Sequence, residues 1–176
     1  LMECLAAGRG ISLPATSTGG GTAATKIAAS YSAVRQQFGI SIGKFEGIQE
    51  QLAEMGGMTY LLEAARQLTC SALNAGQKPP VITAIMKYHT TEMVRVIVNK
   101  AMDICGGKGI SRGPSNLLAQ AYFALPIGIT VEGANILTRS MIIFGQGAMR
   151  CHPFVLDEIL GVEHNNLKIF DRGFWG

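Results

Sequence analysis

The sequence predicts an all-α protein: an up-and-down four-helix bundle followed by a short helical C-terminal extension. Apolar residues recur every three or four positions in the long segments, glycine and proline separate these segments, and the alternation typical of strands is nearly absent. The connections are mostly short, so neighbouring helices should be antiparallel. With 176 residues, 48% hydrophobic and 15% charged, the chain can bury a sizeable core and is not typical of disorder.

The first predicted helix covers residues 2–38, a stretch rich in Ala, Ser and Thr. The run Gly19, Gly20 and Gly21 would weaken an isolated helix by about 1 kcal/mol per glycine relative to alanine. Close approach to a neighbouring helix explains these glycines, with a break in the helix as the alternative. Residues 39–43 then interrupt the pattern.

Two further long helices are predicted, one from about residue 45 to residue 76 and one that restarts at Pro79 and Pro80 and ends at Gly106 and Gly107. The apolar stripe of the earlier helix contains Ile48, Leu52, Met55, Leu62, Ala65 and Leu68, and that of the later helix contains Ile82, Met86, His89, Met93, Ile97, Ala101 and Ile104. Since His89 lies on this stripe, we expect a hydrogen-bonded core histidine.

The remainder of the chain is predicted as a short helix at residues 116–123, an extended or irregular segment at 126–130 and a fourth helix at 133–146. Residues 152–176 are more polar, with one or two short helical pieces. We therefore expect a helical bundle at residues 1–150 and a C-terminal extension at 151–176, the start of an additional region. Because the chain opens within a helix, we expect a fragment of a longer protein.

Composition argues against several kinds of function. A formal net charge of +3 without a dense basic patch does not indicate nucleic-acid binding. The four cysteines (Cys4, Cys70, Cys105 and Cys151) lack metal-ligand spacing, so we expect no metal site and reduced thiols. No apolar run approaches the ~18 residues of a membrane-spanning helix, and no signal peptide is evident.

The glycines at 106, 107 and 109 superficially suggest a phosphate-binding loop. They follow no predicted strand and do not match the P-loop spacing. Taken alone, they indicate the C-terminal stop of a helix.

Glu132 is the acid most suggestive of chemistry, because it lies in an apolar loop that enters a helix. A carboxylate flanked by Ile, Val and Gly is expected to be partly desolvated. Desolvation favours the neutral form and raises the pKa of the carboxyl group toward the range useful for a general base. Acids are also favoured in the first turn of a helix, where they meet the positive end of the dipole. Local chemistry alone leaves the two interpretations even.

Five motifs, in order, resemble the carboxy-terminal helical domain of acyl-CoA dehydrogenases over residues 1–147. They are residues 5–11 (LAAGRGI), 35–39 (RQQFG), 48–55 (IQEQLAEM), 105–110 (CGGKGI) and 131–133 (VEG). Each motif is weak alone, and the ordered set is specific. Residues 129–153 narrow the resemblance to the long bacterial acyl-CoA dehydrogenases of fatty-acid degradation, which carry an additional C-terminal region.

The resemblance implies an FAD-dependent enzyme of β-oxidation that converts fatty acyl-CoA to trans-2-enoyl-CoA. Glu132 matches the general base that removes the α-proton, while the β-hydrogen leaves as hydride to FAD. Gly133 and Arg9 match residues of the substrate site. Some relatives carry the base on the first helix, at the position that Gly8 occupies here, which strengthens Glu132 as the base.

The resemblance also implies FAD contacts. Arg35, Gln37 and Phe38 match the stretch that reaches the flavin of the neighbouring subunit, with Arg35 against its pyrophosphate. The segment that packs on the adenosine end of that flavin is matched by Asp103, Ile104, Cys105, Gly106 and Gly107. Ala134 and Asn135 follow the catalytic pair, where relatives often have Thr and Gln, which puts the flavin contacts of this loop in doubt.

The family implies a homodimer or higher homo-oligomer that shares FAD across subunits, with electron-transfer flavoprotein as electron acceptor. We expect a cytoplasmic protein, or one associated with the inner face of the membrane at full length. The flavin-binding domains of the family are not in this sequence, so the fragment alone should be inactive. The alternatives are an acyl-CoA oxidase of the same fold and a non-catalytic helical assembly domain.

Overall fold

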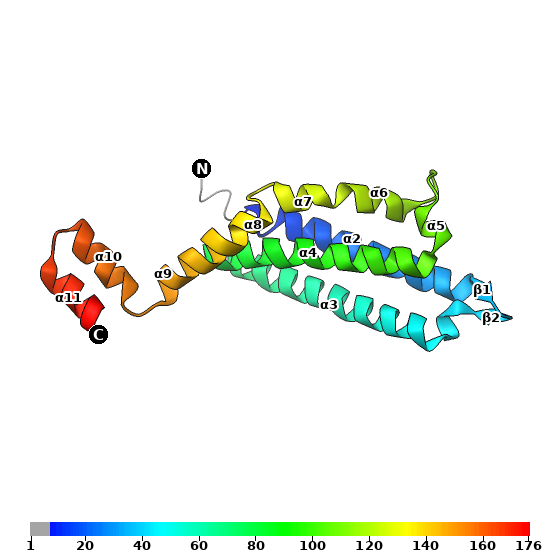
Figure 1. The fold of residues 1–176 in the computed structure, drawn as a ribbon, viewed down its shortest axis with the longest axis horizontal. Coiled ribbons are helices and arrows are strands. Elements are labelled where there is room, and N and C mark those ends of the chain that lie inside the picture. The colour runs from blue at the N-terminus through cyan, green and yellow to red at the C-terminus, as the bar shows by residue number, and fades with distance from the viewer. Residues whose placement is uncertain (1–7) are drawn as a thin grey trace.

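The computed structural model describes residues 8–176 and contains three long helices that lie side by side (Figure 1). These are α2 (Ser12–Val34), α3 (Glu46–Asn74) and α4 (Pro80–Cys105), and each runs antiparallel to the next along the chain. The other elements are β1 (Gln36–Gln37), β2 (Ile40–Ser41), the 3-10 helix η1 (Ile42–Lys44), α5 (Gly107–Ile110), α6 (Leu117–Ala124), α7 (Pro126–Thr130), α8 (Asn135–Leu137), the π-helix η2 (Thr138–Gln146), α9 (Gly147–Cys151), α10 (Val155–Glu163) and α11 (Leu167–Trp175). The all-α class is confirmed. The predicted helix start at residue 2, Cys4 and residues 5–7 of the first motif lie outside the described residues.

Small residues on one face of α2 let the three long helices approach closely. A Cβ added to Gly21 would lie 3.1 Å from Leu62 of α3 and 3.2 Å from Ile97 of α4. A Cβ on Gly20 would meet Val94 at 3.4 Å, whereas one on Gly19 would meet nothing within 4 Å. Close approach therefore explains two of the three glycines, and the helix continues through them without a break.

The interruption expected at residues 39–43 is a tight hairpin and a short 3-10 helix. Strands β1 and β2 pair antiparallel, with Gln36 opposite Ser41 and Gln37 opposite Ile40. Phe38 and Gly39 form the turn with φ angles of 51° and 82°, as two-residue hairpin loops require. The turn reverses the chain between α2 and α3 in few residues.

Helix α4 has the boundaries that the sequence predicts. Pro80 stands in its first turn, where the missing N–H costs no hydrogen bond. Gly106 ends it with φ 54°, and its N–H donates to the carbonyl of Met102 at 2.8 Å. The glycines after α4 thus act as the predicted helix stop.

The buried face of α4 differs from the predicted stripe in its first half. Ile82 is 49% exposed and His89 is exposed, so the core-histidine prediction is wrong. The residues that face the core recur at spacings of four and three: Thr83, Lys87, Thr90, Val94, Ile97, Ala101 and Ile104. Three of these residues are polar, so a pattern of apolar residues did not predict that they are buried.

Two predictions near the loop that carries Glu132 also need correction. Pro126–Thr130 is the helix α7 and not an irregular segment; Pro126 stands in its first turn, where its fixed φ suits a helix. The fourth helix begins at Asn135, continues to Cys151 and contains the nine-residue π-helix η2. It contacts α4, which α6 and α7 also contact, so the described residues form three long helices flanked by shorter ones.

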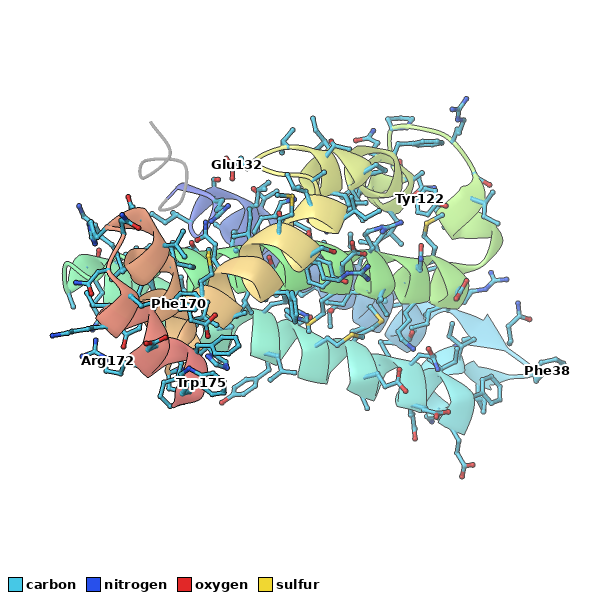
Figure 2. The ribbon with its side chains drawn as sticks, turned by 60° about the vertical axis from the view of Figure 1, so that its left-hand side comes forward. Phe38, Tyr122, Glu132, Phe170, Arg172 and Trp175 are labelled. Atoms are coloured by element: carbon cyan, nitrogen blue, oxygen red, sulfur yellow. The ribbon has the colours of Figure 1, made fainter. Side chains whose placement is uncertain are left out.

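The extension after α9 folds into two short helices, as predicted, and they pack on each other beyond the end of the bundle (Figures 1 and 2). Arg172 of α11 donates to Asp157 of α10 at 2.9 Å. Whether residues 151–176 begin a separate region stays a prediction. Among residues 8–176, no single helix is long and apolar enough to cross a membrane; Leu117–Thr130 and Asn135–Met149 meet that test only together, across a bend of 45°.

Substitutions at Gly21 and Gly19 should change stability in opposite directions. Gly21→Val forces a branched side chain against Leu62 and Ile97, and overpacking of this kind costs about 1–3 kcal/mol. Gly19→Ala enters open space and should stabilise α2 by up to about 1 kcal/mol through helix propensity. Urea unfolding of both variants measures the difference, and equal midpoints would contradict the close packing at Gly21.

Candidate active site

Glu132 lies in the loop between α7 and α8, beside the start of α2 (Figure 2). Its φ is 55° and that of Gly133 is 91°, so two consecutive residues adopt the left-handed region. The Oγ of Ser12 lies 3.1 Å from Oε1 and 3.3 Å from Oε2 of Glu132, and donates to this carboxylate. The loop thus holds the carboxylate in one place against α2.

The position of Glu132 does not match that of a first-turn helix acid. Helix α8 begins at Asn135 with Ala134 as its N-cap, and its first turn contains no acidic residue. The hydrogen bonds of the Glu132 carboxylate go to Ser12 and not to the N–H groups of α8. The structure therefore removes the local argument for a helix-capping role.

Arg9 and Glu132 lie close enough to interact electrostatically. Arg9 is 9% exposed, and its Nη2 donates to the carbonyl of Pro80 at 3.1 Å. Burial lowers the pKa of Arg9, and the carboxylate of Glu132 partly offsets this effect. The fold thus brings together the predicted base and both predicted substrate-site residues, Arg9 and Gly133.

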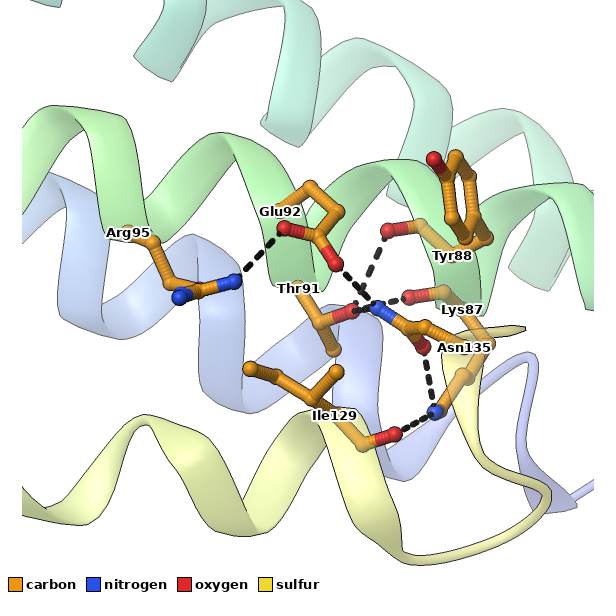
Figure 3. A network of polar contacts seen from close by, with 7 residues as sticks. All are labelled: Lys87, Tyr88, Thr91, Glu92, Arg95, Ile129 and Asn135. Atoms are coloured by element: carbon orange, nitrogen blue, oxygen red, sulfur yellow. Dashed lines mark hydrogen bonds and ion pairs between the residues drawn. The ribbon is translucent and has the colours of Figure 1, made fainter. Parts of the chain in front are cut away.

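Sequence analysis missed Lys87, which is fully buried on α4 and reaches the same loop. Its Nζ donates to the carbonyl of Ile129 at 3.2 Å and to Oδ1 of Asn135 at 2.6 Å (Figure 3). It also donates to the carbonyl of Gly133 at 2.8 Å. Burial lowers the pKa of Lys87, while the carboxylates of Glu132 and Glu92 raise it and Arg9 lowers it. The available signal was its spacing of four residues after Thr83 and three before Thr90 on the buried face.

Asn135 connects this lysine to a polar network on α4 (Figure 3). Its amide nitrogen donates to Thr91 Oγ1 at 3.0 Å and to Glu92 Oε1 at 2.7 Å, and Arg95 pairs with the other oxygen of Glu92 at 2.9 Å. Both amide hydrogens of the side chain are therefore used within the fold. Its predicted flavin contact stays untested, as does that of half-buried Ala134, the N-cap of α8.

The predicted contacts with the neighbouring flavin lie at the opposite end of the bundle. Arg35, Gln37 and Phe38 are exposed at the hairpin, and Phe38, 94% exposed, points away from the bundle (Figure 2). Its ring meets Phe45 edge to face with centroids 6.3 Å apart. These three residues are accessible to another molecule, which their predicted role requires.

The second predicted flavin segment ends α4 at the same end of the molecule as the hairpin (Figure 1). Asp103, Gly106 and Gly107 are exposed, and a Cβ added to either glycine would meet nothing within 4 Å. Ile104 and Cys105 belong to the core, so their side chains are not accessible to a ligand, and burial raises the pKa of the Cys105 thiol. At ~1.5 Å per residue, Asp103 lies about 24 Å along α4 from Lys87.

The described residues contain no group of three or more His, Cys, Asp or Glu side chains that could hold a metal ion. A shallow hollow of about 480 Å³ between α2 and α3 is lined by Ala15, Thr18, Gly19, Thr22, Ala23, Lys26, Glu63 and Arg66. None of the predicted site residues is among them. This hollow is therefore separate from the candidate site.

Comparison with known families decides the identity. The family model described as acyl-CoA dehydrogenase, C-terminal domain, matches residues 1–145. The chain belongs to the acyl-CoA dehydrogenase family. The match includes the three long helices and the loop that carries Glu132.

Individual proteins of similar sequence or structure agree with this family assignment. The probable acyl-CoA dehydrogenase FadE10 of Mycobacterium tuberculosis is 32% identical over 136 residues, 77% of this chain and 21% of that protein. Butyryl-CoA dehydrogenase from Megasphaera elsdenii has a TM-score of 0.71 and 31% identity, over 84% of this chain and 37% of that chain. A chain in a structure of the electron transferring flavoprotein of Acidaminococcus fermentans has a TM-score of 0.71 and 26% identity, over 85% of this chain and 38% of that chain. The chain thus spans about a fifth of the length of the curated relative and under two fifths of these structures.

Replacing Asn135 should destabilise this domain of the dehydrogenase family. Asn135→Ala removes one acceptor from the buried Lys87 and a donor from Glu92, and an unsatisfied buried polar group costs about 1–3 kcal/mol. The neighbouring Ile136 is 76% exposed, so Ile136→Ala should change stability by no more than about 0.5 kcal/mol. Urea unfolding of the two variants tests this difference, and equal losses would contradict the buried network.

Proposed function

We propose that this chain supplies the general base of an FAD-dependent acyl-CoA dehydrogenase that converts fatty acyl-CoA to trans-2-enoyl-CoA in β-oxidation. The observation that carries the proposal is the placement of Glu132. The family's catalytic position coincides with a left-handed loop residue whose carboxylate is hydrogen-bonded to Ser12 and faces two buried cations, Arg9 and Lys87. A carboxylate held in this way is prepared to accept a proton from a substrate carbon.

The proposed chemistry assigns Glu132 to the α-proton of the acyl thioester. Arg9 and Lys87 place positive charges near this carboxylate, and the hydrogen bond from Ser12 limits its rotation. Within the described residues, the backbone N–H of Glu132 donates to no other group, which leaves it available to the thioester carbonyl. A donor at that oxygen would stabilise the negative charge that develops as the proton leaves.

Bound FAD would supply acceptance of the β-hydrogen as hydride. We propose that the hairpin residues Arg35, Gln37 and Phe38 and the exposed end of α4 hold the FAD of a neighbouring subunit. Their residue types suit the task, because a guanidinium binds pyrophosphate through paired charged hydrogen bonds. The open space beside Gly106 and Gly107 gives a ligand access to the backbone. The distance along α4 supports a division in which one subunit's base and its hairpin serve different flavins.

The whole protein is proposed to be a homo-oligomer in the cytoplasm or at the inner face of the membrane. Electron-transfer flavoprotein is its proposed electron acceptor, and the likeness to the Acidaminococcus fermentans structure supports this choice. An acyl-CoA oxidase of the same fold would pass the electrons to oxygen instead. Peroxide production by the full-length enzyme, with no reduction of electron-transfer flavoprotein, would favour the oxidase.

Removal of the base should abolish activity without unfolding the enzyme. In the full-length protein, Glu132→Gln is expected to lower kcat more than about 100-fold, since general-base catalysis contributes about 10²–10⁴-fold. Glu46→Gln is the matched control, because Glu46 is an exposed acid in the first turn of α3. Steady-state kinetics with FAD content measured in parallel decide the outcome. Activity of Glu132→Gln within a few-fold of the parent would contradict the base assignment and favour an assembly role.

The isolated chain should bind FAD poorly and should not dehydrogenate acyl-CoA. The exposed hairpin and the end of α4 supply only part of the family's flavin contacts, and the chain spans about a fifth of its curated relative. Titration of FAD into the purified chain, followed by an activity assay, tests this expectation. Turnover by the isolated chain would show that the remaining domains are not needed.

A further inference from the structure

The ammonium of Lys87 contacts the backbone on both sides of Glu132, in α7 before it and in the loop after it. The carbonyl of Ile129 lies three residues before the base and that of Gly133 one residue after it, and Nζ donates to both. The third acceptor is Oδ1 of Asn135, whose orientation is fixed because its amide nitrogen donates to the carboxylate of Glu92. Three oxygen acceptors match the three N–H donors of a protonated lysine.

The segment between these two contacts is strained. Glu132 has a side chain and a φ of 55°, a left-handed conformation that residues other than glycine rarely adopt. Such a residue persists only where its surroundings hold it. Lys87 supplies that restraint together with Thr138, whose Oγ1 donates to the carbonyl of Gly133 at 3.0 Å.

Lys87 also places a positive charge beneath the catalytic loop. The charged groups that act on the pair Lys87 and Glu132 are Arg9, before α2, and Glu92, on α4. Helices α7 and α8 carry no titratable side chain. Among the ion pairs of the described residues, none includes Lys87. Its ammonium is held by three oxygen acceptors, and the nearby carboxylates of Glu132 and Glu92 favour its charged form.

We propose that Lys87 is a positioning residue for α-proton abstraction, which holds the Glu132 loop in its strained turn and keeps a positive charge next to the base. This role depends on the proposed function, because it assigns how the proposed base is held. A base displaced by about 1 Å can lose about 100-fold in rate, so the loss of these contacts should act on kcat.

The test compares Lys87→Met and Lys87→Gln in the full-length, FAD-loaded enzyme with Lys100→Met as the matched control. Lys100 is a half-buried lysine of the same helix, and it pairs with Glu54 and Gln51 of α3. We expect kcat of the Lys87 variants to fall about 10- to 100-fold, with KM for acyl-CoA within about threefold. Lys100→Met should change neither quantity.

A second measurement follows proton abstraction by Glu132 directly. Exchange of the α-hydrogen of a bound, non-oxidisable acyl-CoA analogue with deuterated water should slow in the Lys87 variants as kcat does. A folded, FAD-loaded Lys87→Met or Lys87→Gln enzyme with parental kcat and parental exchange rate would overturn the positioning role. If neither variant folds with FAD bound, Lys87 is a stability residue and the proposal also fails.

Glu132→Gln, measured in parallel, separates this proposal from the proposed function. If Glu132→Gln loses activity and the Lys87 variants keep it, only the positioning role fails. If Glu132→Gln keeps parental activity, the base assignment fails and the role of Lys87 fails with it.

Discussion

The buried ammonium of Lys87 connects the helical scaffold of this domain to the loop that carries Glu132, the proposed base. Lys87 is fully buried on the central helix α4, and its partners are the carbonyls that flank Glu132 and the side chain of Asn135. A buried charge is costly unless it is fully hydrogen-bonded, so the lysine and the loop depend on each other. The strained turn at Glu132 needs a restraint, and the lysine needs acceptors.

The long helices provide a rigid support for this arrangement. Helix α2 contributes Ser12 and the glycine face, α3 contributes Met55 and Leu62, and α4 contributes the buried line that ends at Ile104. Because α2 approaches the other two helices so closely at Gly21, its start is held in register with the loop that carries Glu132. The far end of the same bundle presents Phe38 and the glycines after α4 to another molecule. The long helices thus separate the proposed base from the proposed flavin contacts.

Sequence patterns predicted the long helices well and the details of their faces less well. The boundaries of α3 and α4 followed from glycine and proline, whose backbone effects are local. The buried face of α4 was misplaced because Thr83, Lys87 and Thr90 are polar and yet face the core. His89, apparently on the apolar stripe, is exposed for the same reason. The helix α7 and the π-helix η2 were missed because packing against α4 favours helical turns where local signals are weak.

The sequence by itself determined the family, the all-α class and the identity of the candidate base, because the motifs and the helix-ending residues are short local segments of sequence. Chemistry near Glu132 left base and helix cap evenly matched, and resemblance favoured the base. Only the tertiary structure showed that Glu132 precedes the N-cap of α8, that its carboxylate meets Ser12, and that Lys87 lies beneath it. Those contacts join residues 46 to 120 positions apart in the chain. Such contacts depend on how the helices pack, which no local pattern specifies.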